Sequence, residues 1–392
     1  MSPIGKRGSR RISVFDTTLR DGEQAPGNAM SPQTKLELAL AIEALGVDVI
    51  EVGFPNSSPS DLAALQLVSQ ALTKARFCSL SRANRADIEA AVTAGGTDRH
   101  QVEIMVTGSE LHMEHKRGIT RAENLAETKF AIGLAHSLGV RDIALGVEDA
   151  SRGSDDLLRA LVETGLSEGA TTVVLADTTG HMVPGEFGEM TAKVRSWIPE
   201  DVVLSVHCHD DMGLSLANAL AAVEAGADEV QATVAGIGER AGNTPLEELV
   251  TVLTYKGHRY NAYTTVETAG LYEVFQTLSR KIGLAPPRNK AIFGDNVFST
   301  LAGIHQAGML RNPITYEFVE PERFGRQRRI LVGRHSGRAV LRHVFDELGL
   351  PWDAALGQKV YEEHIASRSD GDYISVAELT HVLSTTVAAA AI

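Results

Sequence analysis

Between residues 12 and 257 the sequence alternates regularly between short β-branched runs and segments whose apolar residues have helical spacing. The runs are "ISVFD", "VDVIEVG", "RFCSLS", "QVEIMV", "DIALGV", "TTVVLA", "VVLSVH" and "DEVQATV". Segments such as "SPQTKLELALAIEALG" and "RADIEAAVTAG" lie between them. Eight strand–helix pairs in about 250 residues are the count and length of a (β/α)8 TIM barrel. The sequence therefore predicts an α/β fold of this kind. A doubly wound sheet is the alternative, but no GxGxxG turn follows the first run.

The regular alternation ends near residue 258, and a different organisation follows it. Residues 266–285 have a helical pattern, a loop-rich stretch comes next, and the chain closes with a compact helical tail. We therefore expect a flexible basic arm at 1–11 and a TIM-barrel catalytic domain at 12–265. A smaller, mainly helical C-terminal domain is expected at 266–392.

The composition excludes several classes of partner. A net charge of −13 argues against nucleic acid or an anionic membrane, since both require a basic surface. No apolar run approaches the roughly 20 residues that span a bilayer, and no signal-peptide core follows the basic arm. Cys78 and Cys208 cannot build a disulfide framework and fit a reducing compartment. A cytoplasmic protein is expected.

Unusual polar residues gather where the expected strands end, as in "FDTTLRDGEQ", "EVGFPNSSPSD", "LGVEDASR", "LADTTGH", "VHCHDD" and "TVAGIGERAGN". Loops at the opposite ends, such as "ALGVD" and "EAGADE", are short and carry no such residues. Catalytic residues of TIM barrels lie at the carboxyl ends of the strands. The one-sided distribution therefore predicts an active site at that face.

The stretch "VHCHDD" places two histidines on one side of a strand. Because side chains alternate, His207 and His209 point the same way and Cys208 points opposite, which argues against a nucleophilic cysteine. Imidazoles about 6–7 Å apart along a strand can share one cation if a carboxylate comes from elsewhere. The alternative is that both histidines are satisfied by hydrogen bonds inside the barrel.

The best candidate for that carboxylate is Asp21, in "TTLRDGEQ" after the first strand. Its neighbour Arg20 is suited to holding a carboxylate or an enolate oxygen. Asp16 is a candidate to support the ligands, and Asp210 and Asp211 are expected to support them or to start the next helix. A local ion pair between Arg20 and Asp21 is the structural alternative.

The stretch "GIGERAGN" lies between the last strand and a helix, where barrels often bind phosphate. A plain glycine-rich turn is an equal alternative. Asn243 ends the stretch near the expected metal position and could ligate the metal directly or through water. Candidate phosphate-binding residues here are Gly236, Gly238, Glu239, Arg240 and Asn243.

Together, "DTTLRDGEQAPG", "EVGFPNSSPSD", "VHCHDDMGLSLANALAAV" and "GIGERAGNTPLEE" resemble the 2-isopropylmalate synthase and homocitrate synthase family, from about residue 12 to about residue 350. The resemblance implies an acyltransferase that depends on a divalent metal (Mg, Mn or Zn). It implies a Claisen-type condensation of acetyl-CoA with a 2-oxo acid, followed by thioester hydrolysis that releases CoA. The phosphate-binding candidates would then bind CoA.

The resemblance also implies roles for individual residues. The metal would lie on Asp21, His207 and His209, with Asn243 close by. Arg20 would polarise the keto oxygen, and Thr178 would hold the substrate carboxylate. Glu148 and His305 would move the acetyl-CoA proton and prepare the water. Because this histidine comes from the partner subunit in the family, a homodimer is implied in which the C-terminal domain completes the partner's active site.

The expected substrate pocket includes Leu80, Glu103 and Gly146. The sequence around Leu80 resembles that of isopropylmalate synthases. Some homocitrate synthases have an arginine that pairs the distal carboxylate of their substrate, whereas the corresponding positions here are Ala144 and Gly146, which have no charge. Because a buried unpaired carboxylate costs several kcal/mol, an apolar or small substrate such as 2-oxoisovalerate is favoured. The alternatives are homocitrate synthase, a specialised alkylmalate synthase of secondary metabolism, a hydroxyacyl-CoA lyase and a non-catalytic barrel.

Some features depart from the family pattern. "TLAGIH", with Thr300 and Leu301, replaces the family's "HESGIH", and Glu103 stands where isopropylmalate synthases often have histidine. The sequence has no counterpart of the long leucine-sensing domain of many relatives, so feedback inhibition by leucine is not expected.

Overall fold

The computed structural model describes residues 9–369 and 371–390. The chain divides into two compact units, Met1–Ala285 and Pro286–Ile392, and each is described by itself below. The sequence placed this division at 265/266. It falls later because helix α10 (Leu271–Ile282) packs against α1 (Pro32–Ala44) of the first unit, burying Leu271, Val274 and Leu278.

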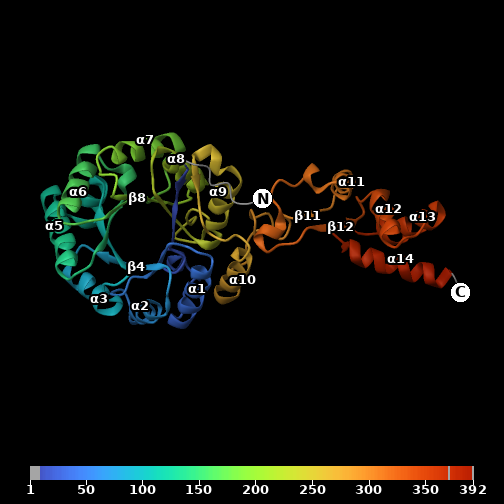
Figure 1. The fold of residues 1–392 in the computed structure, drawn as a ribbon, viewed down its shortest axis with the longest axis horizontal. Coiled ribbons are helices and arrows are strands. Elements are labelled where there is room, and N and C mark those ends of the chain that lie inside the picture. Colours follow the sequence, from blue (N-terminus) through green and yellow to red (C-terminus); the bar gives the residue numbers. More distant parts are fainter. Residues whose placement is uncertain (1–8, 370, 391–392) are drawn as a thin grey trace. The chain divides into compact units, whose positions relative to one another are not determined.

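The first unit is a closed barrel of eight parallel strands, which confirms the predicted fold (Figure 1). Each strand pairs with its neighbours in sequence, and the last pairs with the first. The strands are β2 (Ser13–Asp16), β3 (Val49–Gly53), β4 (Arg76–Arg82), β5 (His100–Thr107), β6 (Asp142–Glu148), β7 (Thr172–Asp177), β8 (Val203–Cys208) and β9 (Glu229–Ala232).

Helices surround the barrel, as Figure 1 shows. Besides α1 and α10 they are α2 (Pro59–Ala71), α3 (Arg85–Gly95), α4 (Glu110–His112), α5 (Arg121–Ser137), α6 (Asp155–Ser167), α7 (Pro184–Arg195), α8 (Ser215–Ala225) and α9 (Leu246–Tyr260). Short 3-10 or π turns lie at Gly22–Gln24, Met113–Arg117, Ala150–Arg152 and Val234–Gly236. Several helices begin where the sequence supplies a polar cap: Ser31, Ser58, Asn84, Thr120 and Ser154 each accept a hydrogen bond from a backbone N–H of the first turn.

The last residues of the predicted 1–11 arm belong to the fold. Residues 1–8 lie outside the described residues, but Arg10–Arg11 forms strand β1, which pairs with β10 (Ala262–Tyr263). Arg10 also donates to the carbonyl oxygen of Val223 at 2.5 Å and pairs with Asp228 at 3.3 Å. These contacts attach the chain just before the barrel to the helix layer.

The second unit combines a small sheet with helices. Its strands are β11 (Ser299–Thr300), β12 (Arg329–Gly333) and β13 (Tyr373–Ser375); its helices are α11 (Gly303–Arg311), α12 (Arg338–Glu347), α13 (Ala354–Tyr361) and α14 (Val376–Ala390). Short 3-10 or π turns lie at Pro313–Thr315, Pro321–Phe324 and Glu362–Ala366. Strand β12 is central, parallel to β11 and antiparallel to β13. Residues such as Val332, Leu341, Phe345 and Leu379 form a separate apolar core. The unit therefore has a core of its own.

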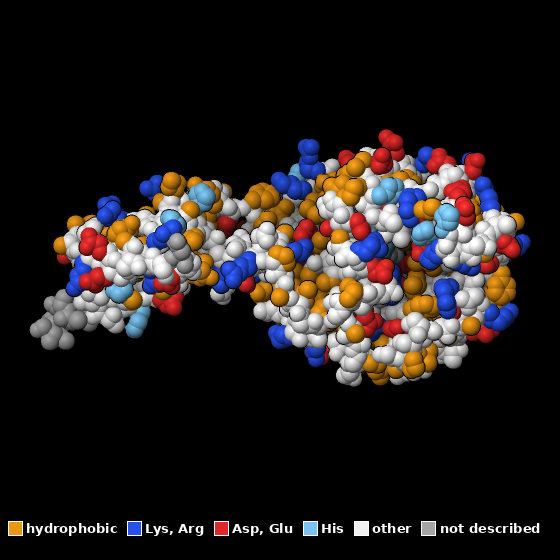
Figure 2. All heavy atoms as spheres, turned by 180° about the vertical axis from the view of Figure 1, so that it is seen from behind, with side chains coloured by type: hydrophobic (Ala, Val, Ile, Leu, Met, Phe, Trp, Pro, Cys, Tyr) orange, Lys and Arg blue, Asp and Glu red, His pale blue; other side chains and the backbone are white. Residues whose placement is uncertain are grey.

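Within residues 9–369 and 371–390, no helix combines the length and apolarity that a membrane crossing needs. On the face that Figure 2 shows, basic and acidic side chains are interspersed over the barrel unit.

Candidate metal centre at the barrel mouth

Three side chains from the two ends of the barrel sequence converge at the carboxyl ends of the strands. Asp21 follows β2, and His207 and His209 lie at the end of β8. The Nε2 atoms of the two histidines are 3.2 Å apart, and Asp21 Oδ2 lies 3.3 Å from His207 Nε2 and 3.8 Å from His209 Nε2. All three residues are buried. The structure therefore brings together the three residues that the sequence proposed as metal ligands.

The orientation of His207 is fixed from behind by Gln231 of β9. The Nδ1 of His207 lies 2.7 Å from the amide oxygen of Gln231, which can only accept a hydrogen bond. A proton is therefore on Nδ1, and Nε2 faces Asp21 and His209, where its lone pair is open to a metal once Nε2 carries no proton. This is the arrangement that a metal-binding histidine requires.

Asn243 also lies at this point, next to His209 through an isolated bridge. Its amide is best satisfied with the nitrogen donating to Asp21 Oδ1 (3.0 Å) and to the carbonyl oxygen of Ile237 (3.2 Å). The amide oxygen then lies 3.1 Å from His207 Nε2. Asn243 therefore lies close to Asp21 and His207, as the sequence predicted.

The loop after β9 closes over this centre. The backbone N–H of Glu239 donates to Asp21 Oδ1 at 3.2 Å, and a Cβ at Gly238 would lie 1.9 Å from the Asn243 amide. The N–H groups of Gly236, Gly242 and Asn243 bond within the same turn region, and Arg240 pairs with Asp211 at 2.8 Å. The loop's observed contacts therefore shape the centre. CoA binding by Gly236, Gly238, Glu239, Arg240 and Asn243 stays a prediction.

Arg20 lies against two carboxylates. Its guanidinium is 2.8 Å from Asp21 Oδ2 and, through Nε, 2.8 Å from Glu51 Oε1 on β3. Glu51 also accepts from the hydroxyl of Thr17 at 2.6 Å. Burial alone would raise the pKa of Asp21, but Arg20 and His207 outweigh it and hold that pKa well below its usual range. Asp21 is thus ionised and available as a ligand.

The environment favours a positive charge among these atoms. Burial acts to lower the pKa of His207, but the hydrogen bond to Asp21 outweighs it and the pKa is raised. For His209, burial and the neighbouring His207 lower the pKa to about 4. One imidazole can hold a proton here while the other stays neutral, and a cation would take the place of that proton.

The residues present fit a divalent metal. Two imidazole nitrogens and one carboxylate oxygen lie within 4.8 Å of one another, and the side chain of Asn243 lies beside them. Such a mixed donor set suits Mg²⁺, Mn²⁺ or Zn²⁺ and leaves coordination positions for a substrate.

Glu148 and Thr178 lie at the ends of neighbouring strands β6 and β7. Lys116 holds the Glu148 carboxylate through both oxygens, at 2.5 and 2.6 Å. The Thr178 hydroxyl oxygen accepts from the backbone N–H of Asp149 at 2.8 Å, so its own proton is free to donate. Both residues are at the catalytic face, but the structure adds an ion pair to Glu148 that the sequence did not predict.

The expected pocket residues lie on β4, β5 and β6. Leu80 and Gly146 are buried, and a Cβ at Gly146 would lie 2.8 Å from Oε1 of Glu103. Glu103 is almost wholly buried, and burial together with the charge of Glu51 raises its pKa to about 7. A carboxyl group therefore occupies the space next to the glycine.

The remaining polar residues near the histidines have structural contacts. Asp210 accepts from both the N–H and the hydroxyl of Ser215 and so begins α8, as expected. Asp16 bonds to Thr18, which in turn binds the loop after β9 rather than the metal ligands. Cys208 is buried, and burial raises the pKa of its thiol. These contacts agree with the prediction that Cys208 is not a nucleophile.

His305 belongs to the second unit, on α11, where it is exposed and its ring lies 4.3 Å from that of Tyr316. Its expected role opposite Glu148 stays a prediction.

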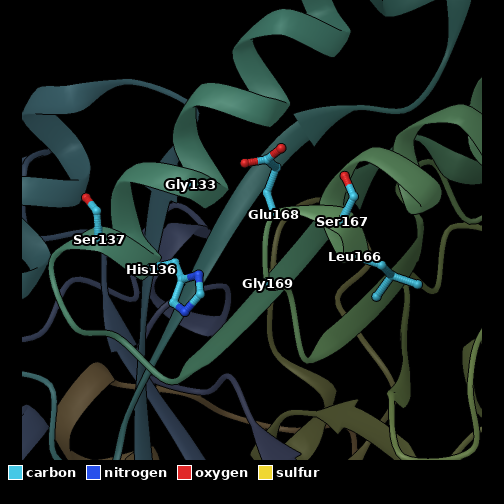
Figure 3. Close-up of a pocket in the computed structure, with 7 residues that line it drawn as sticks. All are labelled: Gly133, His136, Ser137, Leu166, Ser167, Glu168 and Gly169. Carbon is cyan, nitrogen blue, oxygen red and sulfur yellow. The ribbon is translucent and has the colours of Figure 1, made fainter.

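A separate concavity of about 450 Å³ lies where α5 and α6 end (Figure 3). Its walls include His136 and Glu168, whose neighbours are Arg141 at 3.3 Å and Lys129 at 3.6 Å. The carboxyl ends of α5 and α6 lead into the amino ends of β6 and β7, so the concavity lies on the face of the barrel opposite the metal centre. It contains no convergence of donors comparable with that of the mouth.

A scan of protein families matches residues 11–278 to the HMGL-like family. The chain belongs to this family. Residues 292–370 match a second model, described as homocitrate synthase post-HMGL domain-like, so the C-terminal unit of this HMGL-like protein also has counterparts.

The chain is similar to curated proteins named 2-isopropylmalate synthase. That of Sediminispirochaeta smaragdinae is 44% identical over 338 residues, which are 85% of this chain and 67% of the relative. That of Xylella fastidiosa is 40% identical over 356 residues, or 90% and 68% of the two chains. The predicted family is therefore confirmed, and the chain is an enzyme of that family.

Solved structures show the same fold. A hydroxymethylglutaryl-CoA lyase from Pseudomonas aeruginosa matches with a TM-score of 0.60 and 21% identity, covering 71% of this chain and 94% of the lyase. At this identity the likeness concerns the barrel fold.

Sequence reasoning missed three residues of the mouth: Glu51, Gln231 and Lys116. Glu51 and Gln231 are polar residues inside the apolar runs "VIEVG" and "EVQATV", and this is the signal that could have found them. Lys116 lies in a polar loop, where one cation among several gives no such signal.

Proposed function

We propose that this enzyme condenses acetyl-CoA with a 2-oxo acid and releases CoA, as a divalent-metal-dependent 2-alkylmalate synthase of the 2-isopropylmalate synthase type. One observation carries the proposal: Asp21, His207 and His209 converge beside Arg20 at the mouth of a barrel. Its support is the 40–44% identity to relatives named 2-isopropylmalate synthase.

In this proposal the bound metal supplies a Lewis acid that stabilises negative charge on the keto oxygen. Asp21, His207 and His209 hold it, with Asn243 beside them. Arg20 faces the same oxygen and strengthens that stabilisation, since its guanidinium is already fixed by Glu51. The Thr178 hydroxyl donates to the substrate carboxylate.

The chemistry needs a base that removes a proton from the methyl group of the acetyl thioester. We assign this task to Glu148, which must first part from Lys116. The carbanion forms a carbon–carbon bond to the keto carbon, the alkoxide takes up a proton, and water then cleaves the thioester. His305 assists the proton transfers from the second unit of a partner chain, so the active form is a homodimer.

For the 2-oxo acid, we favour 2-oxoisovalerate, because relatives named 2-isopropylmalate synthase are 40–44% identical and Leu80 offers an apolar wall. The carboxyl of Glu103 beside Gly146 favours a second candidate, a 2-oxo acid whose side chain carries a hydrogen-bond donor. It disfavours 2-oxoglutarate, whose distal carboxylate would meet another acid.

The free buried thiols of Cys78 and Cys208 fit the reducing cytoplasm as the site of reaction.

A substrate panel tests the proposal. Purified protein is freed of metal with a chelator, supplied with Mn²⁺ or Mg²⁺ and acetyl-CoA, and offered 2-oxo acids with apolar, hydroxylated, cationic and acidic side chains. We expect free thiol to appear only with metal and a 2-oxo acid, and fastest with 2-oxoisovalerate. Absence of release with every member would contradict the proposal, and cleavage of a hydroxyacyl-CoA without any condensation would favour the lyase alternative.

A further inference from the structure

A chain of hydrogen bonds runs behind the metal centre across the barrel interior. Glu103 Oε2 on β5 accepts from Nε2 of Gln231 on β9 at 3.2 Å, and the Gln231 amide oxygen accepts from His207 Nδ1 at 2.7 Å. Glu103 and Gln231 are each 1% exposed, and His207 is 6% exposed. Because β5 and β9 are not neighbours in the barrel, the chain joins opposite walls.

The direction of each hydrogen bond follows from the donors and acceptors. A carboxyl oxygen accepts, and because Glu103 Oε2 takes its hydrogen bond from Gln231 Nε2, Glu103 holds the NH₂ end of the Gln231 amide toward itself. The oxygen end then faces His207 and requires the proton on Nδ1. Nε2 consequently faces Asp21 Oδ2 and His209 Nε2, 3.3 and 3.2 Å away, and is the nitrogen left to bind a metal. Without an acceptor at position 103, the amide could turn over and offer His207 a donor instead.

The barrel is built to admit this carboxyl group. Gly146 lies on the neighbouring strand β6, and a Cβ there would approach Glu103 Oε1 to 2.8 Å. The positive charge of Arg20 acts on Glu103 across the interior, although Glu51 opposes it. A buried carboxylate is costly unless it has partners, so its presence here calls for a role.

We propose that Glu103 is a positioning residue for the metal centre: through Gln231 it holds His207 in the Nδ1–H form and thereby sets the affinity of the centre for a divalent metal. The inference rests on the proposed function only in taking Asp21, His207 and His209 as ligands. Partners of metal-bound histidines typically change metal affinity about 10–100-fold when they are removed.

The test is Mn²⁺ binding to the metal-free full chain, followed by electron paramagnetic resonance, which needs no turnover. Glu103→Met and Gln231→Met keep the side-chain volume and remove the relay. We expect each to weaken Mn²⁺ binding about 10–100-fold. The matched control is Gln101→Met on the same strand. Gln101 is an equally buried glutamine whose amide donates to Asp142 at 2.9 Å, outside the relay, and its loss should leave Mn²⁺ affinity unchanged.

A second readout separates a relay from a general loss of packing. If Glu103 acts only through Gln231, the double variant should bind Mn²⁺ no more weakly than Gln231→Met alone, whereas independent structural effects would add. If a methionine variant fails to fold, as judged by thermal unfolding, Glu103→Leu and Gln231→Leu take its place.

Wild-type affinity in a folded Glu103 variant, or additive losses, would overturn the inference. Failure of the metal-centre proposal has a different signature: the wild-type protein would not bind Mn²⁺, or His207→Ala would bind it equally well.

Discussion

The mouth of this barrel, at the carboxyl ends of its strands, and its base, at their amino ends, both contain buried charged and polar side chains. The two clusters are organised differently. At the base, Arg76 contacts Asp142 and lies 3.8 Å from Glu229. Gln101 donates to Asp142 at 2.9 Å, and Ser13 donates to Glu229 at 2.8 Å. Each of these two carboxylates therefore accepts a hydrogen bond from another side chain of the same cluster.

At the mouth, by contrast, acceptors face one another. Asp21 Oδ2 and the Nε2 atoms of His207 and His209 lie 3.2–3.8 Å apart, with the Asn243 amide oxygen beside them. Such a group repels itself unless a proton or a cation lies at its centre. Burial of polar groups is therefore no sign of function in this barrel, whereas convergence of acceptors is.

The largest expected effect comes from removing one acceptor. His209→Ala should weaken Mn²⁺ binding by about 100-fold or more, since a ligand contributes at least as much as the partners behind it. Calorimetric titration of the metal-free protein measures the change. Asp142→Asn at the base is the matched change: it should lower the melting temperature and leave Mn²⁺ affinity as it was. Equal Mn²⁺ affinities in the two variants would contradict the claim that the mouth, and not the base, binds the metal.

A smaller effect is expected from crowding the mouth without replacing a ligand. Gly238→Ala places a Cβ 1.9 Å from the Asn243 amide and 2.9 Å from Asp21 Oδ1, so these groups must shift. We expect about 1–3 kcal/mol of lost stability and weaker Mn²⁺ binding, measured by urea unfolding and titration.

The control for this crowding is Gly185→Ala in α7, where nothing lies within 4 Å of the new Cβ. It should be neutral or stabilise the helix by about 0.5–1 kcal/mol. Unchanged Mn²⁺ affinity in folded Gly238→Ala would show that the loop after β9 does not shape the centre.

The smallest effect concerns pH at the base side of β5. His100, the first residue of that strand, stacks on Phe77 at 4.7 Å and lies 2.8 Å from the hydroxyl of Ser79. Burial lowers the pKa of His100 to about 4, below the usual value of 6.5. Between these pH values the unfolded chain binds the extra proton, so stability is present above pH 6.5 and is lost as pH falls toward 4.

From pH 7 to pH 5 this histidine should account for about 1–2 kcal/mol of lost unfolding free energy. Urea unfolding at both pH values, for wild type and for His100→Gln, measures it. The variant should lose less stability on acidification, and an equal loss in both proteins would assign the acid sensitivity to other groups.

The sequence predicted much of the fold because strand–helix alternation is a local property. All eight β-branched runs are barrel strands, and α1 and α3 lie where helical spacing indicated them. The boundary after the barrel was harder to place, since the pattern of α10 does not say which core it joins. Only its contacts with α1 assign it to the first unit.

For the site, period-two alternation was enough to place His207 and His209 on one side of their strand, and chain order placed Asp21 at the same face. The metal role of these residues stays a prediction. Tertiary structure alone decided that Glu51 fixes Arg20, that Lys116 holds Glu148, and that Gln231 reaches across the barrel to Glu103. The local sequence pattern predicts on which side of its strand a side chain lies. Which partner it meets there depends on closing the barrel, which brings together residues as far apart in sequence as Glu103 and Gln231.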